Sequence, residues 1–184
     1  MTRLLLVAAV LLAACRGKQE RVEPPAAEKV VRGKEVVGAL KKNLKGALEQ
    51  ELANGPVAAL VACQSLAPAL AQSLSSEGVL VGRATRKPRN PGNAAAGWTA
   101  DALTRFEKMK SEGKDLLGAS YARRLPDGRT AYAEPLVIQD VCLACHGADL
   151  APEVTAALAE RYPSDQATGY AAGDLRGLAW AELP

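Results

Sequence analysis

The sequence has little aromatic surface and only one histidine. Phe, Trp and Tyr make up 4% of its 184 residues, so alanine and leucine supply most of the apolar surface. A peroxidase or a similar enzyme would need acid and base groups beside an open metal position, and this chain has no second histidine to provide them. We therefore do not expect an enzyme.

The sequence also lacks a strong charge of either sign. Its 23 Lys and Arg residues nearly balance 20 Asp and Glu residues, and the formal net charge of +3 gives no argument for nucleic-acid binding. With 48% hydrophobic and 23% charged residues the composition is that of a globular protein. A length of 184 residues suits one domain better than two.

The N-terminus has the features of an export signal. Arg3 precedes an apolar run, Leu4–Leu12, that is too short to span a bilayer. The tetrad Leu12-Ala13-Ala14-Cys15 resembles the bacterial lipobox, so we expect residues 1–14 to be a signal peptide and Cys15 to carry a lipid. By resemblance to the enterobacterial sorting rule, Arg16 rather than an aspartate after the cysteine favours sorting to the outer membrane. We expect a periplasmic protein anchored to a membrane; an ordinary secretory signal with an incidental cysteine is the alternative.

Two of the four cysteines and the only histidine lie together in Cys142-Leu143-Ala144-Cys145-His146. This spacing forms the attachment site of a c-type haem, in which each thiol adds to a vinyl group and the imidazole binds the iron. Thioether attachment in bacteria takes place outside the cytoplasm, so the export signal supports this interpretation. We expect one covalent haem c per chain, which would also complete the core of a chain poor in aromatics.

A zinc site or a redox dithiol is the alternative for these cysteines. Zinc would need two more Cys or His ligands at workable spacing, and only Cys63 is available. A thioredoxin-like dithiol expects a βαβ context, which the residues around Cys142 do not suggest. Once Cys15, Cys142 and Cys145 are assigned, Cys63 is the one cysteine left without a role in a chain predicted to be exported. By composition alone it would be a small buried hydrophobe.

The order of the predicted elements indicates an α+β fold. Residues 15–29 are charged and contain two prolines, as expected of a lipidated cysteine and a flexible tether, so the folded domain is predicted over 30–184. Helical spacing of apolar residues precedes strand-like runs and an Asp127-Gly128 turn, which predicts N-terminal helices followed by an antiparallel sheet. The predicted helices are 30–53, 56–74 with a kink or break at Pro68, 98–109 and 152–161, and the predicted strands are 78–82, 116–125, 129–138 and 177–183.

A cationic loop follows the first predicted strand. Residues 83–93 hold three arginines, one lysine and two asparagines between prolines. Such a loop is often only a solvated face. A haem, however, has two propionates that need partners, and arginine with neighbouring amide donors binds carboxylates well. The loop is therefore our candidate for this contact.

Short motifs spread from about residue 55 to residue 177 form a set. They are Gly55-Pro56, Ala62-Cys63, Ala67-Pro68, Gly82-Arg83, Lys87, Arg89-Asn90-Pro91, Asn93, Tyr132, Pro135, Cys142 to Gly147, Tyr162-Pro163, Asp165, Ala167, Gly169-Tyr170 and Gly173-Asp174. In this order they resemble the PAS-like single-haem c-type domain that occurs in bacteria alone and as the extracytoplasmic sensor of histidine kinases. The chain departs from that pattern at Ala84-Thr85 and Gly92.

The resemblance implies a PAS-like antiparallel sheet with packed helices, and His146 as one axial ligand of the haem iron. It also implies that Cys63 is the other axial ligand, for which Met109 is the competing candidate. The matching residues that we take as candidate contacts of the haem pocket and the propionates are Arg83, Arg89, Asn90, Asn93 and Tyr132.

A Cys/His pair on the iron predicts a sensor of redox state or of a small ligand such as a gas. A thiolate stabilises ferric iron, and its loss on reduction would open a position for the ligand. The alternative is a one-electron carrier in a periplasmic chain. We find no kinase segment in this sequence, so sensing would require a separate partner such as a signalling kinase, and electron transfer a redox partner protein.

Overall fold

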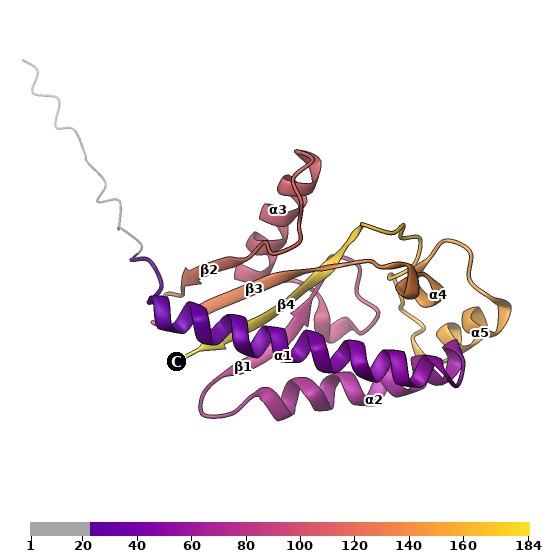
Figure 1. Ribbon diagram of the computed structural model, residues 1–184. Helices are drawn as coiled ribbons and strands as arrows, with labels where there is room; N and C mark the ends of the chain where they lie inside the picture. The colour runs from indigo at the N-terminus through magenta and orange to yellow at the C-terminus, as the bar shows by residue number, and fades with distance from the viewer. Residues whose placement is uncertain (1–22) are drawn as a thin grey trace, which may run out of the picture.

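The computed structural model describes residues 23–184; the predicted signal peptide and the predicted lipid site at Cys15 lie outside the described residues. The described chain folds into five helices and a four-stranded sheet (Figure 1). The α+β prediction is confirmed. The helices are α1 (Ala27–Leu52), α2 (Pro56–Leu74), α3 (Trp98–Ser111), α4 (Leu143–His146) and α5 (Pro152–Arg161), with short 3₁₀ turns at Pro91–Asn93 and Asp140–Cys142.

The sheet is antiparallel throughout, with strand order β1-β4-β3-β2. Gly128 has a φ of 88° and Asp127 accepts the Arg129 amide, so the Asp-Gly turn joins β2 to β3 as predicted. The last strand pairs with β3 on one side and with β1 on the other, which unites the two halves of the sheet. The strands are β1 (Leu80–Ala84), β2 (Tyr121–Arg124), β3 (Thr130–Val137) and β4 (Leu175–Leu183).

Different helices cover the two faces of the sheet. Along β4, Ala179, Ala181 and Leu183 pack with α1, whereas Leu178 packs with Phe106 of α3, as the alternation of side chains along a strand requires. In Figure 1, α1 runs along the first face with α2 beside it, and α4 and α5 lie at one end of the molecule. The first half of α1 therefore packs on the sheet, and its second half extends toward α4 and α5.

α2 carries no charged side chain over its 19 residues. By length and composition it is apolar enough to cross a membrane, but here it packs against α1 and, through Leu60, against Val154 and Leu158 of α5. Pro68 does not divide it. The proline and Gln64, four residues before it, are both exposed, so water can reach the carbonyl that the ring leaves without a helical partner.

Most predicted boundaries lie within two residues of the observed ones, and two differ by more. α1 begins at Ala27, so the last three residues of the predicted tether are helical. The predicted strand 116–125 is reduced to β2, because Leu116 turns into the core beside Phe106 and Gly118 takes a φ of 76°. The segment between α3 and β2 is thereby a loop that approaches the end of β3.

Candidate functional site

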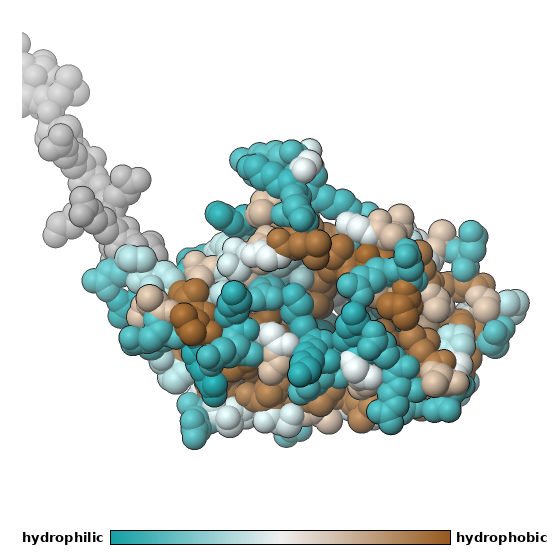
Figure 2. Space-filling model, in the orientation of Figure 1, coloured by the Kyte–Doolittle hydropathy of each residue, from teal (hydrophilic) through white to brown (hydrophobic). Residues whose placement is uncertain are grey.

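A cavity of about 380 Å³ lies between α1, α2 and the end of β3, next to α4. Leucines and alanines of the two long helices form much of its wall, and the loop after α3 closes one side. Figure 2 shows hydrophobic residues gathered around a hollow in the middle of this face of the molecule. The volume falls within the range of small-molecule and cofactor pockets, roughly 300–1,000 Å³.

The four residues predicted to hold a haem all line this cavity. Cys142 ends the 3₁₀ turn that precedes α4, and Cys145 and His146 lie in the single turn of α4. Cys63 reaches the cavity from α2, between Ala59 and Ala67, which line it too. Packing of α2 against α4 therefore joins the two parts of the predicted site.

His146 is held as a neutral imidazole. Its Nδ1 lies 2.6 Å from the carbonyl oxygen of Ala167, and since a carbonyl can only accept, Nδ1 carries the proton and donates. Burial, together with the nearby Arg89 and Arg176, lowers the pKa of the ring to about 3. The lone pair of Nε2 is thus available for a metal ion.

The cysteine thiols lie in a partly desolvated environment. Burial raises the pKa of Cys63, while the positive charges of Arg83 and Arg89 oppose this shift. Burial likewise raises the pKa of Cys145, whose Sγ lies 3.9 Å from the carbonyl oxygen of Pro56 at the start of α2. Arg83 is therefore a cation that lies close to the proposed thiolate ligand.

The lining of the cavity is cationic as well as apolar. Three arginines line it, Arg83, Arg89 and Arg176. Among the described residues, only Arg89 of these three forms an ion pair with an acidic side chain, that of Asp165. Burial lowers the pKa of both Arg83 and Arg176. Among residues 23–184 no Asp or Glu lines the cavity, whereas Lys41, Lys45, Arg83, Arg89 and Arg176 do. A ligand with an apolar body and anionic groups fits this lining, and a haem with its two propionates has both features.

The other predicted pocket residues divide into two groups. Asn90 and Asn93 line the cavity, although the Asn90 side chain also accepts the amide of Gly92. Tyr132 does not line it: its ring is buried under α1, and its hydroxyl donates to Glu134. Met109 packs against the cluster under α3, also away from the cavity lining.

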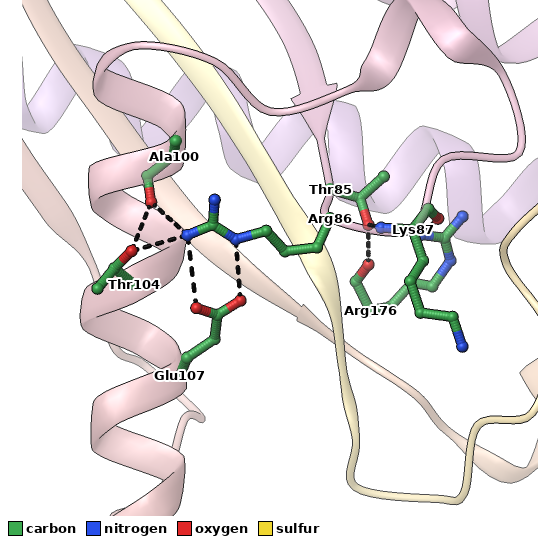
Figure 3. A network of polar contacts seen from close by, with 7 residues as sticks. All are labelled: Thr85, Arg86, Lys87, Ala100, Thr104, Glu107 and Arg176. Atoms are coloured by element: carbon green, nitrogen blue, oxygen red, sulfur yellow. Dashed lines mark hydrogen bonds and ion pairs between the residues drawn. The ribbon is translucent and has the colours of Figure 1, made fainter.

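Arg176 is a cavity residue that sequence reasoning missed. Its Nη1 donates to the hydroxyl of Thr85 at 2.9 Å and to the carbonyl oxygen of Lys87 at 3.1 Å, while the neighbouring Arg86 turns away to Glu107 of α3 (Figure 3). No local signal marked Arg176, because its place in the cavity depends on the pairing of β4 with β1.

Comparisons with known proteins add a family and a fold. The family model described as Tll0287-like matches residues 14–184. A solved structure described as the crystal structure of the cyanobacterial heme-protein Tll0287 superposes with a TM-score of 0.67. It shares 23% sequence identity, and the match covers 87% of this chain and 97% of that chain, so the two have the same fold. No curated protein matches the chain.

Proposed function

The chain belongs to the Tll0287-like family, and from that premise we propose that it is a haem-binding protein, specifically a lipid-anchored periplasmic monohaem c-type protein that senses redox state or a small ligand. The observation that carries the proposal is that Cys63, Cys142, Cys145 and His146 line one cationic cavity. The heme-protein with the same fold supports it.

Each lining residue then has a role toward the haem. A bound haem would supply an iron centre that gains and loses one electron. Cys142 and Cys145 would hold its two vinyl carbons, and His146 would bind the iron through Nε2. Arg83 and Arg176 have no acidic partner among the described residues, so they are the cations best placed to bind propionates, with Asn90 and Asn93 beside them.

The sensor role depends on Cys63. As a thiolate it would bind the oxidised centre, with the charge of Arg83 nearby to balance its own. Cys63 would leave the reduced centre, and a small ligand such as carbon monoxide or nitric oxide would take its place. Output would then pass to a separate partner, for which a signalling kinase is our proposal.

Mass and spectra of the exported protein test this function. We expect the mass of the chain with one haem, and ferric optical and spin-resonance spectra that change in the variant Cys63→Ala. Met109→Leu is the matched control, because Met109 packs under α3 and should leave the spectra unchanged. Identical ferric spectra in the wild type and Cys63→Ala would remove Cys63 from the iron, and a protein without haem would overturn the proposal.

Electron transfer is the second candidate, and one surface feature favours it. Leu117 is 77% exposed and Val141 is 38% exposed, and both line the cavity. Apolar side chains beside a redox centre can contact a partner protein. Carbon monoxide added to the reduced protein separates the two roles: we expect binding if Cys63 leaves, whereas a carrier with both ligands retained would not bind and would instead exchange electrons rapidly with a periplasmic donor.

A further inference from the structure

The segment 162–170 is hydrogen-bonded to the last residue of α4 and to the glycine that follows it. The amide of Gly169 donates to the carbonyl oxygen of Gly147, and the amide of Tyr170 donates to that of His146, both at 2.9 Å. The Tyr170 ring also meets the His146 ring edge-on, with centroids 6.3 Å apart. The orientation of the imidazole therefore depends on where this segment lies.

Asp165 accepts a hydrogen bond from Ala167, the residue that the imidazole contacts. Its Oδ1 accepts the amide of Ala167 at 2.8 Å, and the carbonyl oxygen of Ala167 accepts the Nδ1–H of His146 at 2.6 Å. The two bonds thus use the amide and the carbonyl group of Ala167. A shift of the Asp165 carboxylate would thus move the acceptor of the imidazole.

Arg89 joins this segment to α4. Its guanidinium donates to Oδ2 of Asp165 from Nε at 3.1 Å and lies 3.0 Å from it through Nη2. The same Nη2 donates to the carbonyl oxygen of Cys145 at 2.5 Å. The Arg89 and Asp165 side chains are 11% and 10% exposed, so the pair is screened little by solvent. One cation thus bridges the helix that carries His146 and the segment that carries its acceptor.

We infer that Arg89 and Asp165 are positioning residues that fix the orientation and tautomer of the His146 ring, and through it the electronic state of the proposed haem iron. This assigns Arg89 to the axial histidine rather than to the propionates, because its Nε and Nη2 donate to Asp165, to Cys145 and to the Ala167 carbonyl oxygen that also accepts from His146. The inference rests on the proposed function only in that His146 binds iron. Partners of a ligating imidazole set its basicity and its ring plane.

The test compares Arg89→Gln, Asp165→Asn and the double variant, with haem attachment checked by mass in each. A charge effect alone would move the reduction potential down in Arg89→Gln and up in Asp165→Asn, and leave the ferric spin-resonance g-values unchanged. Positioning predicts changed g-values in both single variants, and a change in the double variant smaller than their sum. Lys41→Met is the matched control, because Lys41 lines the cavity and pairs with Glu134 but does not touch the segment 162–170.

A second measurement does not need haem. His146 is the only histidine, so the nitrogen resonances of a histidine-labelled full chain report one ring. We expect the Nδ1–H tautomer in the wild type and in Lys41→Met, and a mixture of tautomers in Arg89→Gln and Asp165→Asn. Unchanged g-values in haem-bound variants, or an unchanged tautomer in the haem-free ones, would overturn the inference, whereas a wild type without haem would overturn only the proposed function.

Discussion

The hydroxyl of Tyr132 donates a 2.9 Å hydrogen bond to one oxygen of Glu134, and the other oxygen of this carboxylate pairs with Lys41 at 2.8 Å. The tyrosine is only 2% exposed. Burial, followed by the hydrogen bond to Glu134, raises its pKa to about 12 from the ordinary 10.0. A phenolate here would lie in a largely buried position beside a carboxylate, so the folded chain keeps the neutral phenol.

Tyr132 should make the fold sensitive to alkali. Its pKa is higher in the folded chain, so its contribution to stability is complete below pH 10 and is lost as the pH rises from 10 toward about 12. We predict that the free energy of unfolding falls more steeply over this range in the wild type than in Tyr132→Phe, which has no phenolic proton to lose. Urea unfolding at several pH values checks this, with Tyr121→Phe on β2 as the control. Parallel curves for the wild type and Tyr132→Phe would contradict the prediction.

At the scale of elements, the contact of α1 with the sheet depends on one missing side chain. A Cβ at Gly33 would lie 2.6 Å from the Cβ of Tyr132, whereas a Cβ at Gly38 would meet nothing within 4 Å. We predict that Gly33→Ala lowers the free energy of unfolding by about 1–3 kcal/mol through overpacking. Gly38→Ala should raise it by up to about 1 kcal/mol, because alanine favours the helix. Chemical denaturation of both variants measures the difference, and equal effects at the two positions would refute the close contact.

The elements that sequence reasoning predicted well have local signals. Pro56 marks the start of α2, Pro152 that of α5, and Asp127-Gly128 the hairpin turn, and each requires only a few neighbouring residues. The haem motif is local as well. Features that depend on distant pairing were not accessible: Arg176 reaches the cavity only because β4 lies between β1 and β3, and Tyr132 lies under α1 rather than in the cavity lining because of the face that β3 presents.

Pro68 shows a further limit. Its effect on the helix depends on exposure, which the sequence pattern does not reveal: Pro68 is exposed, the loss of one hydrogen bond is tolerated there, and the helix continues. Cys63 is different again. Composition alone predicted a buried hydrophobe, and only the family resemblance directed attention to it as a ligand candidate, in agreement with its place in the cavity lining.

At the scale of the whole molecule, five cationic side chains meet around one cavity that no carboxylate of the described residues lines. Lys41, Lys45 and Arg89 pair with nearby carboxylates, but Arg83 and Arg176 have no acidic partner among the described residues. Without an anionic ligand the charges of these two arginines are left uncompensated and repel each other, and salt weakens that repulsion as the Debye length shrinks from about 30 Å at 0.01 M to about 8 Å at 0.15 M. We predict that salt raises the thermal stability of the haem-free chain more than that of the haem-bound protein. Haem-free Arg176→Gln should respond less than the haem-free wild type, and an equal salt response of the haem-free and haem-bound forms would contradict the prediction.

The path of α1 also separates the cavity from the proposed membrane anchor. The helix begins at Ala27, and the residues with which it lines the cavity start at Lys41 and end at Leu52. At 1.5 Å per residue they lie roughly 20 to 40 Å along the helix from its first turn. With the proposed lipid on Cys15, the first part of α1 would place the cavity at the end of the helix that is farther from the anchor. Partners and dissolved gases would then approach the cavity from the aqueous side.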